Sequence, residues 1–560
     1  MGRIDSQTLF ITTSPRTPAR MIPEIALLAE HFTGKKWNQE TQVKFMEVLR
    51  EENFFNGKGE NDPAFSARDR INRSPKALGL VQLSPTIQLT PAGQNILNTR
   101  RQDEALLRQM LKFQLPSPFH KPTSKAAQFY IKPYLEFLRI IRTLGNLRFD
   151  ELQIFAMQLT DWHDFDQIIN KIEKYRTDIA TTTLTYKQLK AEYLKKELSQ
   201  VFAERISKGD IKTRETSDAS LAKFLRTQAS NLRDYADAAV RYLRATGLVN
   251  VSHKGRTLSI IPERIEDVDY ILSTIDRNPQ SFKSEEDYIN YLGCANTPIL
   301  FTDNKEALIN KLNREFPMLK ISDQIMVEQL KDMLADHLEQ RKAANIQEQI
   351  RQIKDYRLYD DIQNIFQQIE NNELYDAPLM LEWNTWRAMT MLDGGDIKAN
   401  LNFDDFGQPL STAQGNMSDI ICDYGDFFVS VEVTMASGQK QYDMEGEPVS
   451  RHLGKLKKTT DKPSYCLFVA PTINEACIAH FYTLHHLSIS YYGGKSVIIP
   501  LPLSVFKKML EDSYKASYKP NPAQVRKFFE QSTILAQTHN NEQDWYNAIY
   551  ETALHWLEIS

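Results

Sequence analysis

The chain has 560 residues, with 68 Lys and Arg against 72 Asp and Glu, so its formal net charge is −4. It is 41% hydrophobic and 25% charged, which is typical of a soluble globular protein of three or four domains. No apolar run reaches the roughly 20 residues of a membrane-spanning helix, and the N-terminus lacks a signal-peptide core. Four cysteines form no CxxC pair, so we expect reduced packing residues in a cytoplasmic protein.

Charge is distributed unevenly along the chain. Residues 1–270 contain 41 basic and 32 acidic side chains, whereas residues 271–560 contain 27 and 40. A basic first half favours a polyanionic partner, and an acidic second half suits cation chemistry. Chance asymmetry over a long chain is the alternative explanation.

Two segments of the first half share one order of predicted elements: a helix that ends at glycine, a β-run, a turn and a second β-run. They are residues 66–97 and 233–263, with Gly79 and Gly247 at the helix ends. In the first segment a Thr-Pro pair at 90–91 then begins another helix, with Thr as N-cap and Pro at the first helical position. This order predicts two winged helix-turn-helix subdomains.

Basic side chains lie where such subdomains contact DNA. Arg and Lys on a recognition helix can reach guanine O6 and N7 in the major groove, and basic wing tips suit phosphates. The alternative is that these helices contact proteins or are simply solvated. The candidate DNA-binding residues are Arg68, Arg70, Arg73 and Lys76 on the first helix, and Lys254 and Arg256 at the second wing tip.

The pattern changes in the second half. Residues 323–374 contain no Gly or Pro and predict long helices, which form either a connector or an interaction arm. From residue 378 a helix is followed by a hairpin and by two apolar strands, at 465–471 and 496–502, with a helical stretch between them. Continuous apolar runs favour buried, parallel pairing. The segment from 504 to 560 reads as helical.

Two carboxylates flank the predicted hairpin turn at Gly425-Asp426. The register of this turn sets Asp419 opposite Glu432, on the face away from the apolar side chains. Opposed like charges are destabilising, by about 3 kcal/mol at roughly 5 Å and an effective dielectric near 20. A shared proton or a bound cation would relieve the repulsion; alternatively, both acids splay into water.

Further polar residues extend this pair into a candidate site. Glu382 lies on or beside the apolar stripe of the predicted helix 379–391, where an unpaired charge is costly. Glu445 lies 13 residues after Glu432 and is followed by His452. Such a set can assemble a Mg²⁺ site for phosphodiester hydrolysis, in which the metal activates water and stabilises charge on phosphate. His452 would orient water or bind phosphate, unless it is an ordinary hydrogen-bonded histidine.

Seven short motifs occur in order along most of the chain: "SPRTPARMIPE", "FSARDR", "LTPAG", "LEWNTW", "GNMSD", "VEVT" and "MEGEPVSRH". In this order they resemble the AlwI family of type IIS restriction endonucleases, which includes related site-specific nicking enzymes. The resemblance implies an N-terminal DNA-recognition region, a helical linker and a C-terminal nuclease of the PD-(D/E)XK type. It also implies cleavage a few base pairs outside an asymmetric site.

The resemblance also implies the site residues, one by one. Asp419 matches the aspartate of the nuclease core and Glu432 the acid of its second strand. Glu382 matches the helix carboxylate and Glu445 an additional acid. Asp419, Glu432 and Glu445 are the expected Mg²⁺ ligands. Thr434 stands where the standard motif has lysine, so the group that positions the nucleophile is unassigned.

The expected fold is multidomain, mainly α plus α/β, in four parts. They are a winged-helix DNA-recognition subdomain at 1–150, a second one at 151–275, a helical linker at 276–374, and a PD-(D/E)XK-like nuclease domain at 375–560.

The expected function is that of a Mg²⁺-dependent type IIS restriction endonuclease acting on double-stranded DNA in a prokaryotic cytoplasm. One active site cuts one strand, so double-strand cleavage requires a second copy or a small catalytic subunit. One alternative is a strand-specific nicking endonuclease, the large subunit of a heterodimer. The other is a non-catalytic winged-helix regulator, which would bind DNA without cutting it under any divalent ion.

Overall fold

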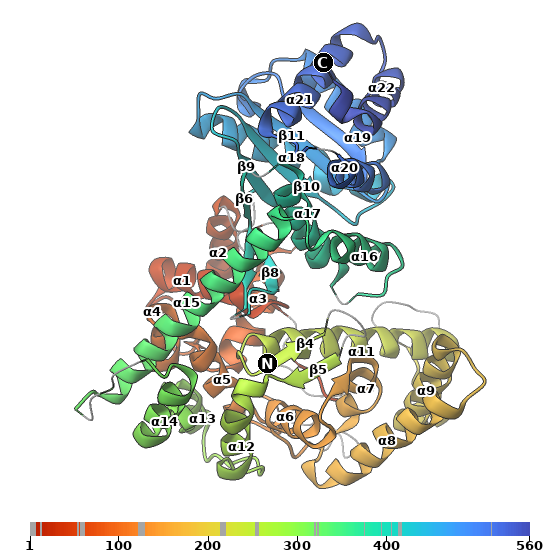
Figure 1. Cartoon of the computed structure of the whole chain (residues 1–560). Coiled ribbons are helices and arrows are strands. Elements are labelled where there is room, and N and C mark those ends of the chain that lie inside the picture. Colours follow the sequence, from red (N-terminus) through yellow and green to blue (C-terminus); the bar gives the residue numbers. More distant parts are fainter. Residues whose placement is uncertain are drawn as a thin grey trace. The chain divides into compact units, whose positions relative to one another are not determined.

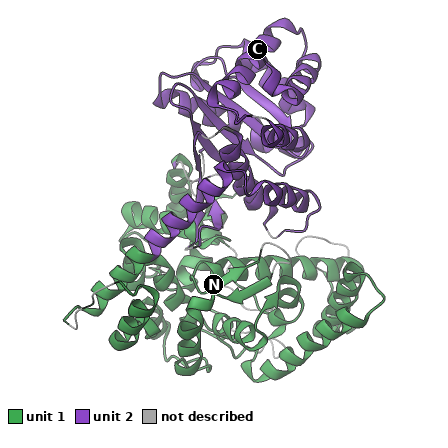
Figure 2. Cartoon of the chain, viewed as in Figure 1, with its two compact units in different colours: residues 1–51, 57–337 green, residues 52–56, 338–560 purple. Residues whose placement is uncertain are grey.

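The computed structural model divides the chain into two compact units, which Figure 2 colours separately. Unit 1 comprises residues 1–51 and 57–337, and unit 2 comprises residues 52–56 and 338–560. The described residues are 7–11, 14–52, 55, 62–120, 129–212, 220–252, 257–318, 321, 324–374, 376–393, 395–404, 406–412, 417–516 and 518–559.

Unit 1 begins with a three-helix cluster followed by a short hairpin. Helices α1 (Met21–Phe32), α2 (Gln39–Glu51) and α3 (Pro63–Ala77) pack against one another. The hairpin pairs β1 (Val81–Gln82) with β2 (Gln88–Leu89) in antiparallel fashion. The predicted order of a helix and two strands is therefore present in the first segment.

Local sequence explains how the next helix begins. Helix α4 (Pro91–Asn98) has Thr90 as its N-cap, whose Oγ1 accepts a hydrogen bond from the Gly93 amide at 3.0 Å. The predicted cap is therefore confirmed. Gly79 ends the preceding helix with a φ of +72°, and a Cβ there would lie 2.4 Å from the Cβ of Leu292. Both the backbone angle and the packing require glycine.

The second predicted segment consists of α11 (Leu221–Arg244) and the antiparallel strands β4 (Val249–Val251) and β5 (Thr257–Ile260). Strand β3 (Leu147–Arg148) completes a three-stranded sheet in the order β3-β5-β4. The predicted wing tip with Lys254 and Arg256 lies outside the described residues. The remaining α-helices of unit 1 are α5 (Gln102–Lys112), α6 (Pro133–Leu144), α7 (Phe149–Ile154), α8 (Phe165–Thr181), α9 (Tyr186–Val201), α10 (Ala203–Ser207), α12 (Ile265–Thr274), α13 (Glu285–Gly293) and α14 (Lys305–Glu315).

Helix α15 (Val327–Lys354) begins in unit 1 and continues into unit 2. Buried charges hold its first turns: the Lys331 ammonium lies 2.8 Å from a Glu104 carboxylate oxygen and 2.5 Å from one of Asp303. Arg108 binds the same two acids at 2.7 and 2.9 Å. Because each buried charge has partners of opposite sign, the network fixes this end of α15 without an uncompensated ion.

Residues 338–374 pack with the core of unit 2, although the sequence placed them in a linker. Ile353 of α15, together with Ile362 and Phe366 of α16 (Tyr359–Glu370), is buried in the same hydrophobic cluster as the strands. The predicted helices of this stretch are confirmed.

Unit 2 is built around a five-stranded mixed sheet in the order β12-β11-β10-β9-β6. Figure 1 labels four of these strands, β6, β9, β10 and β11. Strands β10, β11 and β12 are parallel, whereas β9 runs antiparallel to both of its neighbours. The parallel pairing predicted from the two apolar runs is confirmed. The strands are β6 (Asp396–Ala399), β9 (Ile420–Asp423), β10 (Phe428–Val433), β11 (Ser464–Ala470) and β12 (Ile498–Pro502).

The hairpin β9–β10 has the predicted register. Cys422 pairs with Val429 and Ile420 with Val431, and these four side chains are buried. Gly425 in the turn has a φ of +87°, as a tight hairpin turn requires. Continuing this register by one residue sets position 419 opposite position 432.

Helices pack on the strands of the sheet, and the turn of a second hairpin contacts α15 at Gly407. The predicted helices after residue 378 and beyond residue 504 are confirmed. Within the described part of the chain, no helix has the length and hydropathy to cross a bilayer. The helices of unit 2 after α16 are α17 (Ala377–Asp393), α18 (Gln439–Thr459), α19 (Glu475–His486), α20 (Leu503–Lys515), α21 (Pro522–Thr538) and α22 (Glu542–Leu554). The second hairpin pairs β7 (Leu401–Phe403) with β8 (Pro409–Thr412).

Gly454 sets the position of α18, because a Cβ on it would lie 2.8 Å from the Cα of Tyr492. Alanine in a helix interior normally stabilises by about 0.5–1 kcal/mol over glycine. Here we expect Gly454→Ala to lower the free energy of unfolding by about 1–3 kcal/mol, because the new methyl meets backbone atoms. Chemical denaturation measures this, and Lys440→Ala, at an exposed position of α18, is the control. A more stable Gly454→Ala variant would contradict the close packing.

Candidate active site

Glu432 is a carboxylate placed inside the sheet. It lies on the central strand β10 with only 4% of its surface exposed. Its Oε1 is 3.0 Å from Nδ1 of His452 on α18, and the hydroxyl of Ser418 also donates to the carboxylate. The register explains the location: Glu432 points away from the apolar face formed by its neighbours Val431 and Val433.

Asp419 is the residue directly before β9, and its side chain lies beside Glu432. Its Oδ2 accepts a hydrogen bond from the Val433 amide at 2.8 Å, and its own carbonyl accepts one from the Asn400 amide at 2.8 Å. The side chain is half-buried. The structure therefore brings Asp419 beside Glu432, as the hairpin register predicts.

Glu445 approaches from α18. Its half-buried carboxylate accepts a hydrogen bond from the hydroxyl of Thr434, the residue directly after β10. That hydroxyl also accepts from the Ala436 amide at 3.1 Å. The threonine at the position of the expected lysine thus orients the third acid.

Burial raises the pKa of every acid of this cluster, and repulsion between carboxylates adds to it at Asp419 and Glu432. Burial is the largest cause that raises the pKa of Asp419 well above its usual range, and the charges of Glu432 and Glu445 raise it further. Burial likewise raises the pKa of Glu432 and, to a smaller degree, that of Glu445. Perturbed acids that face one another are typical of functional sites.

His452 is neutral at physiological pH. Burial, with the nearby Arg451 charge, lowers the pKa of its imidazole to about 4. When Nδ1 carries the proton and donates to Glu432, Nε2 is left with a lone pair. The site therefore contains a proton acceptor beside three carboxylates.

The donor set fits a hard divalent cation held largely by water and substrate. Among the described residues, no group of three or more His, Cys, Asp or Glu side chains is arranged to hold a metal ion by itself. Mg²⁺ typically takes one or two protein carboxylates and completes its shell with water and phosphate oxygens. Asp419 and Glu432 supply such a pair, and a cation would relieve the Glu432 repulsion that, after burial, raises the pKa of Asp419.

Glu382 lies half-buried on α17, which contacts both β9 and β10. Its helix thus packs on the hairpin that carries the acid pair. Its catalytic role stays a prediction.

The predicted DNA-binding residues of the first segment all lie on α3. Arg68 donates to the Gln42 side chain at 2.9 Å, and Arg70 forms an ion pair with buried Glu24. The Lys76 ammonium lies 4.3 Å from the centroid of the Phe119 ring and 3.6 Å from a Glu285 oxygen. Arg73 pairs with Asp69 and is the most exposed of the four, at 49% of its side chain.

Sequence reasoning missed Ser418 and Thr434. Their hydroxyls bind Glu432 and Glu445, respectively. Each stands next to an element of the hairpin. The sequence places each hydroxyl at a strand end near a candidate acid, but it does not show which carboxylate the hydroxyl binds.

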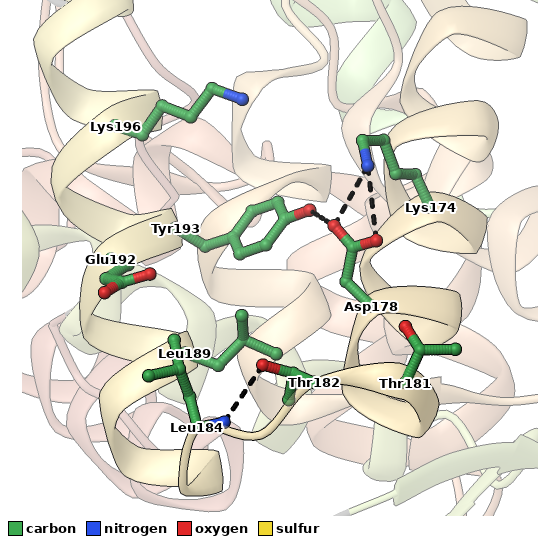
Figure 3. Close-up of a pocket in the computed structure, with 9 residues that line it drawn as sticks. All are labelled: Lys174, Asp178, Thr181, Thr182, Leu184, Leu189, Glu192, Tyr193 and Lys196. Carbon is green, nitrogen blue, oxygen red and sulfur yellow. Dashed lines mark hydrogen bonds and ion pairs between the residues drawn. The ribbon is translucent and has the colours of Figure 1, made fainter.

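A separate surface pocket of about 540 Å³ lies between α8 and α9 of unit 1 (Figure 3). Three of its polar groups are already bound to one another: Asp178 accepts from Lys174 at 3.0 Å and from the Tyr193 hydroxyl. None of the acidic residues of the candidate site lines this pocket.

Removing the charge of Asp419 should stabilise the protein. An acid whose pKa is raised by folding holds its proton longer in the folded state, so stability falls as pH rises through that interval. Each unit of upward shift corresponds to about 1.4 kcal/mol. We expect Asp419→Asn to unfold at higher temperature than the wild type at pH 8 without divalent cations, with a smaller difference near pH 4.

Differential scanning calorimetry at both pH values measures this. Asp443→Asn, at an exposed position of α18, should leave the unfolding temperature unchanged. A lower unfolding temperature for Asp419→Asn at pH 8 would contradict the buried repulsion.

Comparison with known proteins gives a family for this chain. The model of the family described as the AlwI restriction endonuclease matches residues 76–509. The comparison with curated protein sequences found no match.

Three solved structures show limited similarity. The small subunit (R.BspD6I2) of the heterodimeric restriction endonuclease R.BspD6I is 26% identical, over 36% of this chain and 96% of that chain, with a TM-score of 0.28. The BpuJ1 endonuclease binding domain, in complex with pyrene- and phenanthrene-modified DNA, is 14% identical over 50% of this chain and 91% of that chain, with a TM-score of 0.33. Restriction endonuclease FokI is 11% identical over 90% of each chain, with a TM-score of 0.24. These TM-scores are too low to support an argument. The family match extends over most of the sequence, and the chain therefore belongs to the AlwI restriction endonuclease family.

Proposed function

We propose that this protein is a type IIS restriction endonuclease. Unit 1 binds a short asymmetric site in double-stranded DNA, and unit 2 hydrolyses a phosphodiester bond a few base pairs away. The observation that carries the proposal is the convergence of Asp419, Glu432 and Glu445 from a hairpin and the next helix along the chain. Membership of a restriction endonuclease family supports it.

DNA recognition falls to the helix–hairpin segments of unit 1, which we interpret as winged helices. In the first, α1, α2 and α3 precede the β1–β2 hairpin, so α3 occupies the position of a recognition helix. In the second, α11 precedes β4 and β5. The basic first half of the chain supports a polyanionic partner.

Catalysis falls to the acidic cluster, which we interpret as a PD-(D/E)XK-type centre. Mg²⁺ bound by Asp419 and Glu432, with Glu445 nearby, would lower the pKa of water and stabilise charge on the phosphate. The Val433 amide fixes Asp419, and the Thr434 hydroxyl fixes Glu445.

Proton transfer falls to His452 in this proposal. Its Nδ1 is held by Glu432, so its neutral imidazole presents Nε2 to accept a proton from the attacking water. Glu382 on α17 adds a further carboxylate from the helix that packs on the hairpin.

A single centre of this kind cuts one strand. Cleavage of both strands therefore requires a second nuclease domain, from another copy of the chain or from a small catalytic subunit. Without one, the same chemistry produces a strand-specific nick.

Cleavage should depend on a divalent cation. We expect supercoiled plasmid to be converted to linear or open-circular DNA in Mg²⁺, and to stay intact in EDTA until Mg²⁺ is added back. Gel electrophoresis reports both products, and linear DNA indicates cleavage of both strands. Sequencing the ends then gives the site and the cut offset. Plasmid that stays supercoiled under all divalent cations would reject the endonuclease in favour of a non-catalytic DNA-binding protein.

Removal of either paired acid should separate cleavage from binding. Asp419→Asn and Glu432→Gln should lower the cleavage rate at least about a thousandfold, since each removes a negative charge that would hold Mg²⁺ against the phosphate. Binding of site DNA, measured by mobility shift, should remain within about twofold. Asp443→Asn serves as the control on α18. Full cutting by Asp419→Asn would show that the metal and the water are held elsewhere.

A further inference from the structure

Helix α3 has two distinct faces. Ala64, Ala67 and Ile71 are buried on the side that packs on α1 and α2. Phe65, Asp69 and Arg73 are spaced four residues apart and therefore share the other side of the helix. Phe65 and Arg73 are exposed there, with Asp69 between them. These three residues, here called the outer stripe, recur every four residues.

The other basic residues of α3 are held by the protein itself. Arg70 is paired with Glu24, which is 3% exposed, and Arg68 is bound to Gln42 of α2. Breaking the pair of Arg70 would leave a buried carboxylate without its counterion, which is costly. These two arginines therefore hold α3 on the cluster.

Phe65 lies in the first turn of α3 with 56% of its surface exposed. The Asp62 carboxylate caps this turn by accepting from the Phe65 amide at 2.8 Å, so the ring is presented on ordered backbone. Single exposed apolar residues are common on protein surfaces. This one stands at the N-terminal end of the helix in recognition position, the end that contacts base edges in a helix-turn-helix protein.

The chemistry of the outer stripe matches the major groove. A phenylalanine ring packs on the 5-methyl group of thymine, an aspartate accepts from cytosine N4, and an arginine donates to guanine O6 and N7. Residues four apart are about 6 Å apart along a helix, close to two base-pair steps of about 3.4 Å. Asp69 and Arg73 are paired with each other, so the arginine is oriented before DNA arrives.

We propose that the outer stripe is the base-reading face of α3, and that Phe65 reads the methyl group of a thymine in the recognition site. The occupant of this face is the major groove of double-stranded DNA, whose guanine O6 and N7 acceptors suit the exposed Arg73. The inference rests on the proposed function and adds the residue that selects thymine.

The test compares binding of two duplexes that differ only in thymine methyl groups. Site DNA is amplified with dTTP or with dUTP, and its affinity is measured without divalent cation so that no cleavage occurs. The wild-type protein should bind the uracil duplex about fourfold more weakly, because burying one carbon of the methyl group contributes ~0.8 kcal/mol to the binding free energy. Phe65→Ala should bind the thymine duplex about fourfold more weakly than the wild type and should not distinguish the two duplexes.

Two further variants complete the test. Phe65→Leu keeps an apolar side chain and should retain part of the preference for thymine. Ile299→Ala removes another exposed apolar side chain of unit 1 and should behave as the wild type. The unfolding temperature of Phe65→Ala should be unchanged because the ring is exposed.

Several outcomes would overturn the inference while leaving the endonuclease intact. They are a wild-type protein that binds both duplexes equally, a Phe65→Ala variant that keeps the full preference for thymine, and a Phe65→Ala variant that loses all specific binding. A wild-type protein that neither binds a specific site nor cuts DNA would instead reject the proposed function, and the inference with it.

Discussion

The burial of like charges beside a β-hairpin is the constraint on which the rest of unit 2 depends. Glu432 is almost fully buried on the central strand, and Asp419 and Glu445 are directed at the same space. Such a cluster costs folding free energy unless protons or a cation compensate it. The acids are held together against this repulsion by the Val433 amide and by the Ser418 and Thr434 hydroxyls.

Stability and chemistry oppose each other at this site. The same desolvation that raises the carboxylate pKa values also strengthens any interaction of these groups with a bound charge. It keeps the imidazole of His452 neutral, which a proton acceptor needs to be. A less buried cluster would be easier to fold and poorer at holding a cation against phosphate.

Much of this arrangement could be predicted from the sequence, because it depends on local rules. Alternation along the strands and the Gly425-Asp426 turn define which residues of the hairpin pair, and the Thr90 cap marks the beginning of α4. Interactions between distant residues could not be predicted in this way. The pair of Arg70 with Glu24 and the bond of Thr434 with Glu445 depend on tertiary packing, which no local pattern encodes.

The contacts of helix α15 limit where residues can be inserted into this chain. Its first turns are clamped by Lys331 with Glu104 and Asp303, and it continues without interruption past the boundary between the units. One residue inserted into an α-helix advances the downstream residues by about 1.5 Å and turns them by about 100°. One residue inserted beside Lys331 would therefore turn the buried Leu334, one turn further along the same helix, out of its packing in unit 1. Insertions of arbitrary length are better tolerated in the loops.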